Sequence, residues 1–368
     1  MKKFLATAAV LAFCLLCAGK TPKLTVTPAS DPRVTIIGRT LVDGESVSFD
    51  WTGVYARVRF KGRYLAMRVS DTGKNYYNVW LDTDTAREPD RVVSTFGRDS
   101  LVVLFDENSI RDKGIHNVVI QKRTEAEQGR TTIHSFCSEG SLLAAEPVRD
   151  RLIEFIGDSY TCGYGSENSV RSDPFRPETE NSNKTYATIL SRYFGADYIL
   201  CAHSGQGISR NYDDFGRGWH MPDRYGCVFD CDKEGGEWHG GGYQPDLTVI
   251  YLCTNDFSCY RQPNLKEFKD NYIRLLRSVK DNYGGDHPVL LVSGPSDEMM
   301  RVYIKAVADD CGMKNVHAMV LCPMGINSDD DLGASWHPNY QGHKKWAHAI
   351  LPYISTITGW PLEDKVLK

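Results

Sequence analysis

Hydrophobic and polar residues alternate along the first part of the chain, from about residue 33 to residue 140. In VYARVRF, Val54, Ala56, Val58 and Phe60 would point to one face of a strand and Arg57 to the other. The runs YLAMRV, YNVWLD, SLVVLF, HNVVIQKRT and TTIHSF continue the pattern as further strands, with Gly, Asp and Asn turns between them. Many short strands with regular turns are typical of an antiparallel β-sandwich. We therefore predict a jelly-roll-like β-sandwich domain over residues 20–145.

The pattern changes near residue 150. Continuous apolar runs, LIEFIG, DYILCA, LTVIYLC, PVLLVSG and VHAMVLC, now alternate with segments of helical period. The first such segment places Tyr186, Ile189, Leu190 and Tyr193 on one face. Strands that are apolar on both faces and separated by helices predict a parallel sheet in a three-layer α/β/α domain, here over residues 146–368. Active sites in such sheets lie at the carboxyl ends of the strands, so a catalytic residue should directly follow an apolar run.

The first nineteen residues, MKKFLATAAVLAFCLLCAG, have the layout of a secretory signal peptide. Two lysines precede an apolar run that is too short for a comfortable membrane span. A bacterial lipoprotein modified at Cys14 or Cys17 is the alternative, although the bulky residues Phe13 and Leu16 precede these cysteines. We expect residues 1–19 to direct export, giving a periplasmic, secreted or cell-surface lipoprotein, with no membrane insertion beyond such a lipid anchor.

Charge and cysteine content exclude several classes of function. The formal net charge is −4 and no long basic block occurs, which argues against nucleic acid as a partner. Of eleven cysteines, Cys14 and Cys17 lie in the leader, and the remaining odd number does not indicate a disulfide framework. Cys227 and Cys231, near His220 and His239, match no standard zinc spacing. A disulfide or buried thiols are the favoured interpretation there, and we predict no metal site.

Ser159 is the first candidate catalytic residue, because it directly follows the apolar run LIEFIG and Asp158. A serine hydroxyl is a weak nucleophile and needs a base within hydrogen-bond reach. The best base is His337 in SWHPNYQGH, which lies in a turn before a predicted helix, with Trp336 beside it. Alone, each motif has an ordinary structural interpretation, as a turn, a helix cap or a loop.

Two other strand ends offer donors that could stabilise an oxyanion. HSGQG follows DYILCA and places the backbone N–H of Gly205 there, and TND follows LTVIYLC and offers the side-chain amide of Asn255. The backbone N–H of Ser159 would be the third donor. Asn255 and Asp256 could equally cap a helix. The ordered set, rather than any single motif, favours acyl transfer.

The motifs GDSYTCGYG, HSGQG, TND and WHPNYQGH resemble, in order and spacing, the four sequence blocks of the SGNH or GDSL-type hydrolases. ISRNY, MPDRYG, NDFS and the preceding sandwich make the chain most similar to carbohydrate esterase family two, secreted bacterial deacetylases of acetylated plant polysaccharides. The resemblance implies that Ser159 is the nucleophile, His337 the base, and Ser159, Gly205 and Asn255 the oxyanion hole. It also implies that Trp336 binds substrate by stacking on a sugar ring, and that no metal or organic cofactor is needed.

The chain departs from the family pattern at two places. Cys253 stands where the superfamily usually has glycine, two residues before the oxyanion asparagine. The acid of the catalytic triad usually lies two or three residues before the histidine, where this chain has Ser335 and Ala334. We therefore expect a Ser–His dyad in which a backbone carbonyl orients the imidazole. A carboxylate from the run Asp329–Asp331 is the alternative, although a solvated acidic loop is the favoured interpretation of that run.

The leading hypothesis is an exported serine esterase that removes O-acetyl groups from xylan, mannan or related oligosaccharides through an acetyl-enzyme. One alternative is an esterase or lipase acting on another acyl ester, and another is a carbohydrate-binding protein whose hydrolase site has decayed. The first domain is expected to buttress one wall of the cleft. Its aromatic residues form either a sugar platform or core packing: Trp51, Tyr55, Tyr76, Tyr77 and Trp80.

Overall fold

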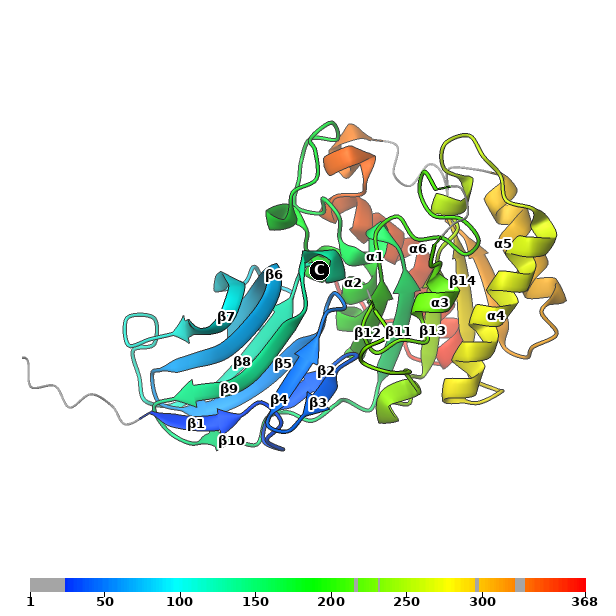
Figure 1. Ribbon diagram of the computed structural model, residues 1–368. Helices are drawn as coiled ribbons and strands as arrows, with labels where there is room; N and C mark the ends of the chain where they lie inside the picture. The colour runs from blue at the N-terminus through cyan, green and yellow to red at the C-terminus, as the bar shows by residue number, and fades with distance from the viewer. Residues whose placement is uncertain (1–23, 215–217, 231, 295–297, 322–327) are drawn as a thin grey trace, which may run out of the picture.

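The computed structural model describes residues 24–214, 218–230, 232–294, 298–321 and 328–368. The predicted signal peptide, residues 1–19, lies outside these ranges. Figure 1 shows two units side by side, a curled antiparallel sheet followed by a parallel sheet with helices on both faces. The fold class predicted from the sequence is therefore confirmed.

The first unit is a ten-stranded antiparallel sheet. Its elements are β1 (Thr25–Pro28), β2 (Thr35–Ile37), β3 (Leu41–Asp43), β4 (Ser46–Phe49), β5 (Tyr55–Lys61), β6 (Leu65–Leu81), β7 (Arg91–Phe105), β8 (Ile115–Lys122), the 3₁₀-helix η1 (Ala126–Gln128), β9 (Thr131–Ser138) and β10 (Leu142–Leu143). The long strand β6 pairs with β9 through its first half and with β8 through its second half, while β7 follows it along both. This arrangement lets the strands curl around one core.

The sequence pattern predicted two strands where the structure has the single strand β6, so this prediction was wrong. YLAMRV and YNVWLD were expected to be separate strands, because Asp71 and Gly73 between them look like a turn. In the structure, register shifts on both sides of Asp71 absorb these residues, and the strand continues. The Asp71 carboxylate accepts hydrogen bonds from Gly73 N (3.2 Å) and Asn75 Nδ2 (2.9 Å). A bulge of this kind bends a strand without ending it.

The aromatic residues of the first unit pack into its core and interfaces. Trp51, Tyr55, Tyr77 and Trp80 are at most 5% exposed. The hydroxyl of Tyr76 donates a hydrogen bond to Glu178 Oε1 of the second unit at 2.6 Å. These five side chains therefore form no exposed sugar platform, and the core-packing interpretation holds for the four buried ones.

The second unit is built on a five-stranded parallel sheet in the order β12-β11-β13-β14-β15. Its strands are β11 (Leu152–Gly157), β12 (Asp197–Ala202), β13 (Leu247–Tyr251), β14 (Val289–Ser293) and β15 (Val316–Val320). Its α-helices are α1 (Ser159–Cys162), α2 (Tyr186–Phe194), α3 (Met221–Arg224), α4 (Leu265–Tyr283), α5 (Glu298–Asp310) and α6 (Tyr340–Thr358). Short 3₁₀-helices are η2 (Pro177–Thr179), η3 (Ser182–Lys184), η4 (Gly240–Gly242), η5 (Asn255–Phe257), η7 (Asp329–Asp331) and η8 (Ala334–Trp336).

Helices cover both faces of this sheet, and the strands β11, β12, β13 and β14 accordingly bury residues on both sides, whereas the edge strand β15 is largely exposed. Ile153 and Phe155 of β11 pack with the apolar stripes of α2 and α6, whereas Ile156 belongs to the cluster that contains α4 and α5. Among the described helices, none is both long and apolar enough to cross a membrane.

A buried arginine joins the two units. Arg39 of the first unit is completely buried, and its guanidinium pairs with Glu154 of β11 at 3.3 Å. It also donates hydrogen bonds to the carbonyls of Tyr225 (2.5 Å) and Cys227 (3.1 Å). The ring of Tyr225 lies 4.5 Å from its Cζ and that of Trp238 4.9 Å. A charge held this far from water is tolerated only because it has these partners.

The contact between the units continues on both sides of Arg39. Trp51 Nε1 donates a hydrogen bond to Val228 O at 2.9 Å, and Arg57 forms a buried ion pair with Asp197 of β12. The rings of Tyr55 and Tyr198 lie 4.8 Å apart. The first unit is therefore fixed directly against the strands that carry the candidate site.

We predict that Arg39→Met destabilises the protein by about 3–5 kcal/mol, because Glu154 would be left as a buried charge without its ionic partner. Urea unfolding of the purified protein measures this free energy. Arg68→Met is the matched control, since the Arg68–Asp99 pair is about half exposed (52% and 53%) and its loss should change stability far less. Equal small effects of both substitutions would contradict the prediction.

Candidate active site

Ser159 stands at the carboxyl end of β11, which lies between β12 and β13 in the sheet. Asp158 caps the short helix α1 by accepting a hydrogen bond from Tyr160 N at 3.1 Å. Ser159 is the first residue of this helix and is 7% exposed. Burial raises the pKa of Asp158 to about 7. The strand end therefore fixes the backbone of the serine rigidly while its hydroxyl stays at the edge of the sheet.

His337 is brought to Ser159 from the far end of the chain. Its Nε2 lies 2.9 Å from Ser159 Oγ, and its Nδ1 lies 3.0 Å from the carbonyl oxygen of Ser335. A carbonyl can only accept, so the hydrogen of the neutral ring resides on Nδ1 and the lone pair of Nε2 faces the hydroxyl. This is the tautomer that a general base for Ser159 requires.

The carbonyl of Ser335 is aimed by an unusual turn. Ser335 and Trp336 both have positive φ, 52° and 58°, in the left-handed region that side chains other than glycine rarely adopt. The backbone N–H of Ser335 donates to Asp173 O and that of Trp336 to Arg171 O, each at 3.0 Å. These two bonds hold the strained turn in place from outside η8.

Aromatic rings enclose the imidazole of His337. Tyr164 stacks on it with centroids 4.2 Å apart, and Tyr160 meets it edge-on at 5.3 Å. Phe175 stacks in turn on Tyr164 at 4.2 Å. Burial lowers the pKa of His337 to about 4, although the hydrogen bond to Ser335 acts in the opposite direction. The ring is therefore neutral at pH 7.

The three predicted oxyanion donors lie around the same strand ends. Gly205 follows β12 with a positive φ of 75°, and Asn255 follows β13 as the first residue of η5. Asn255 Nδ2 lies 3.2 Å from Asp158 Oδ2 and 2.8 Å from Gln206 O, which connects it to the neighbours of both Ser159 and Gly205. Within the described ranges, the backbone N–H groups of Ser159 and Gly205 donate to no acceptor. Asn255 differs, because both hydrogens of its amide are engaged.

Asp256 has a role that the sequence did not reveal. Its neighbour Asn255 was considered as a helix cap together with it, but the Asp256 carboxylate instead accepts three backbone N–H groups. These come from Ile208 (2.9 Å), Ser209 (2.7 Å) and Arg210 (3.0 Å). The buried carboxylate thus holds the loop that follows Gly205 against β13.

Two exposed aromatic side chains stand next to these groups. Trp336, which the resemblance marks as a substrate contact, is 60% exposed beside His337. Tyr212 is 64% exposed, and its backbone N–H donates to Gly205 O at 2.7 Å. Tyr212 was not predicted, although it belongs to the motif ISRNY. Both rings offer apolar faces to a ligand at the sheet edge.

The two departures from the family pattern have structural counterparts. Cys253 is buried and has a φ of 112°, which explains why glycine is the usual residue there. In the acidic run, Asp331 is 1% exposed and binds Lys345 Nζ at 2.6 Å, while Asp329 pairs with Arg171 at 2.5 Å. The solvated-loop interpretation is thus wrong for Asp331.

The potential metal ligands named from the sequence do not form a cluster in the described residues. Cys227 is a buried free thiol and His239 is exposed, while Cys231 lies outside the described residues. In the part of the chain that is described, the only three metal-ligand side chains close enough to share an ion are Glu125, Cys162 and Glu180, whose ligand atoms lie within 4.8 Å of one another. No sequence motif predicts this cluster, because its members come from both units.

Comparison with known proteins gives consistent results for both units. Residues 36–147 match the family model for the N-terminal domain of carbohydrate esterase 2, and residues 155–345 match that of the GDSL-like lipase/acylhydrolase family. A family two carbohydrate esterase from Clostridium thermocellum, solved in complex with cellohexaose, is 30% identical with a TM-score of 0.80, over 89% of this chain and 100% of that one.

Curated relatives agree with this. The cellulase/esterase CelE of Acetivibrio thermocellus is 32% identical over 84% of this chain, which spans only 38% of that longer protein. An acetylxylan esterase/glucomannan deacetylase of Cellvibrio japonicus is 28% identical over 88% of this chain and 90% of its own length.

We predict that the imidazole of His337 keeps its neutral form until the pH falls to about 4, because burial penalises the charged form. NMR titration of the histidine ring resonances measures this midpoint. In Tyr164→Ala, water replaces the stacked ring and the midpoint should rise toward the ordinary value of about 6.5. A midpoint near 6.5 in the unmodified protein would show that the ring is solvated and would contradict this account of the site.

Proposed function

The chain belongs to family two of the carbohydrate esterases, and from this membership we propose that it removes O-acetyl groups from plant-type polysaccharides or oligosaccharides such as xylan or mannan. Family members are ester hydrolases, and this chain is a carboxylic ester hydrolase. One observation carries the finer proposal: Ser159 Oγ and His337 Nε2 lie 2.9 Å apart at the sheet edge where two backbone N–H donors remain open.

The reaction would proceed in two halves. Ser159 Oγ attacks the acetyl carbonyl carbon as His337 Nε2 takes the hydroxyl proton. The negative oxygen that forms is stabilised by the backbone N–H groups of Ser159 and Gly205, and by Asn255 if one amide hydrogen turns from its present acceptor. The bond to the sugar oxygen then breaks, and that oxygen receives the proton from His337. Water, activated by the same ring, releases acetate and restores the serine.

A backbone carbonyl would replace the acid of a triad in this scheme. Ser335 O fixes the tautomer and direction of His337 as a carboxylate would, but it carries no full charge to stabilise the imidazolium. The low pKa of His337 agrees with this environment, because no carboxylate contributes to it. We therefore propose a Ser–His dyad as the catalytic unit.

The substrate is proposed from the surroundings of the dyad and from the relatives. Exposed rings at Trp336 and Tyr212 would stack on sugar faces, whereas a long acyl chain would need an extended apolar groove. One relative is named acetylxylan esterase/glucomannan deacetylase, and a solved relative binds cellohexaose. Acetylated plant polysaccharides lie outside cells, which fits the proposed export by residues 1–19.

We predict that Ser159→Ala and His337→Ala each lower the rate of acetate release at least about 10³-fold, because each removes half of a cooperating pair. Release is measured from acetylated xylan and from an aryl acetate. Ser169→Ala, a substitution of an exposed serine on the loop after α1, is the matched control and should keep full activity.

Three outcomes would contradict this function. Full activity of Ser159→Ala would exclude it as the nucleophile. Faster hydrolysis of octanoate than of acetate esters would favour another acyl substrate. Saturable glycan binding without acetate release by the unmodified protein would indicate a decayed, carbohydrate-binding hydrolase.

A further prediction concerns Trp336. Trp336→Ala should raise the KM for acetylated xylo-oligosaccharides about two- to tenfold, corresponding to about 0.5–1.5 kcal/mol of lost ring stacking. The kcat for a small aryl acetate should stay unchanged, since that substrate has no sugar to stack. Trp336→Phe retains a ring face and should restore much of the affinity. A loss of aryl acetate kcat instead would mean that the substitution disturbs His337.

A further inference from the structure

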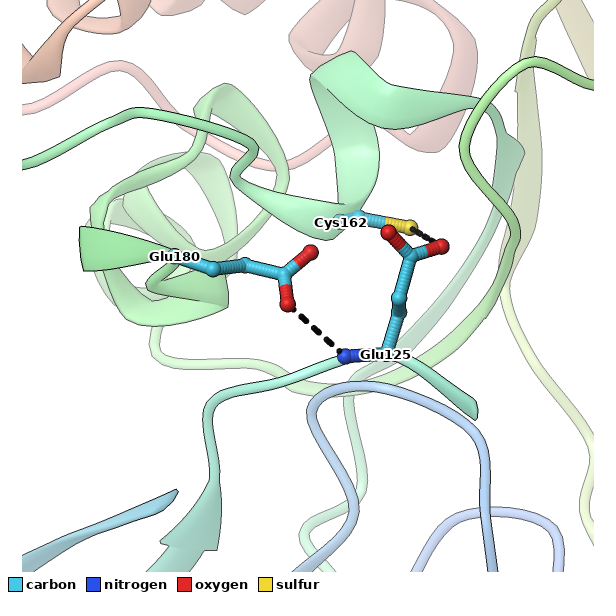
Figure 2. Close-up of side chains that lie close together, drawn as sticks. All are labelled: Glu125, Cys162 and Glu180. Carbon is cyan, nitrogen blue, oxygen red and sulfur yellow. Dashed lines mark hydrogen bonds between the residues drawn. The ribbon is translucent and has the colours of Figure 1, made fainter. Parts of the chain in front are cut away.

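Three buried side chains, one from the first unit and two from the second, lie close together (Figure 2). Glu125 comes from the first unit, at the residue before η1, and Cys162 and Glu180 come from the second. Each is at most 1% exposed. Cys162 Sγ lies 3.6 Å from Glu125 Oε2, and Glu125 N donates to Glu180 Oε2 at 3.1 Å.

The backbone of the Glu125 loop is fixed from both sides. Lys122, at the end of β8, is itself buried and donates from Nζ to the carbonyls of Thr124 (2.6 Å) and Glu125 (2.9 Å). Arg123 Nε donates to Glu180 O at 2.9 Å in the second unit. The carboxylate of Glu125 is therefore presented by a rigid support rather than by a flexible loop.

The target of this carboxylate is the segment that ends in Gly205. Glu125 Oε2 accepts a hydrogen bond from the backbone N–H of Ser204 at 2.7 Å. Glu127, two residues after Glu125, contacts the neighbouring residue His203: its Oε1 lies 3.3 Å from His203 Nε2. On the other side of the ring, His203 Nδ1 lies 2.6 Å from Asp230 Oδ2. Residues 203 and 204 are thus held by side chains of the first unit immediately before the predicted oxyanion donor.

We propose that Glu125 is a positioning residue for the oxyanion hole, supplied by the first unit to the second. By binding the N–H of Ser204, it fixes the His203–Ser204 peptide, which directly precedes the peptide that carries the Gly205 N–H, and so restricts the direction of that N–H. Asp256 holds the loop on the other side of Gly205, through residues 208–210. The inference rests on the proposed function, since it concerns how that reaction's oxyanion is stabilised.

A metal ion shared by Glu125, Cys162 and Glu180 is the competing interpretation. Their spacing would allow it, and Glu180 Oε1 is buried without a hydrogen-bond partner. However, Glu180 Oε2 already accepts the backbone N–H of Glu125 at 3.1 Å. Glu125 Oε2 is already occupied by Ser204 and Cys162. The contacts therefore favour a hydrogen-bonded support over a metal site.

The test compares three substitutions in the purified full chain, with kcat and KM on an aryl acetate expressed per active site. Active sites are counted by stoichiometric labelling with a serine-reactive fluorophosphonate. Glu125→Ala should lower kcat about tenfold to a hundredfold, since loss of a whole oxyanion donor costs about 10²–10³-fold and here the donor is misdirected. KM should change less than about twofold.

Two conservative variants separate positioning from folding. Glu125→Gln keeps an acceptor oxygen at the same distance and should retain kcat within a few-fold. Glu125→Asp keeps the carboxyl group but withdraws it by one methylene from the Ser204 N–H, so kcat should fall as in Glu125→Ala. Glu178→Gln is the control for the interface, because Glu178 also bridges the units, through Tyr76, but lies outside the Ser204 contact. It should have unchanged kcat.

An unchanged kcat per active site in both Glu125→Ala and Glu125→Asp, even with a lower melting temperature, would overturn the proposal. If Glu125→Ala does not fold, the contrast between the Gln and Asp variants decides. Stoichiometric metal in the purified protein, lost in Glu125→Ala, would also overturn it in favour of a metal site. The proposed function is judged separately: if Ser159→Ala stays active, that function fails, whereas an inactive Ser159→Ala with normal Glu125 variants refutes only this inference.

Discussion

Parallel hydrogen bonding between three neighbouring strands is the constraint on which the site depends. Gly157 of β11 pairs with Ala202 of β12 and with Tyr251 of β13, so the three strands end level with one another. Ser159, Gly205 and Asn255 each follow one of these ends within a few residues. A slip of one residue between strands would turn every side chain to the opposite face of the sheet. The helices packed on both faces oppose such a slip, and they therefore also fix the positions of the strand ends that carry Ser159, Gly205 and Asn255.

The same constraint explains what could be predicted from the sequence. Apolar runs locate strand ends, and strand ends of a parallel sheet meet at one edge, which is why Ser159, Gly205 and Asn255 could be grouped without a structure. His337 could be added only because a serine at that edge needs a base. A backbone carbonyl as the partner of His337 was also expected, since no acidic residue precedes the histidine at the usual distance, but the sequence did not indicate that Ser335 supplies it.

Features that the sequence could not give depend on contacts between distant segments. Arg39 and Glu154, or Glu125 and Ser204, become partners only when the two units pack, and nothing in their local patterns marks them. The segment around Asp71 was predicted to be a turn because local residue preferences do not reveal a β-bulge that neighbouring strands stabilise. Asp331 was predicted to be solvated because it stands in a run of acidic residues, and the sequence does not show its contact with Lys345. In each case tertiary packing overrode a local signal.

The turn at Ser335 and Trp336 serves two purposes with one backbone conformation. Its left-handed residues direct a carbonyl inward to His337, and the same turn exposes the indole of Trp336 outward. The orientation of the imidazole and the exposure of the indole therefore depend on the same backbone conformation. An insertion or deletion in this turn would move the indole and would also release the imidazole from the Ser335 carbonyl. Under the proposed function, a change in glycan preference would therefore arise by exchanging side chains on this turn, or on other loops such as the one that carries Tyr212.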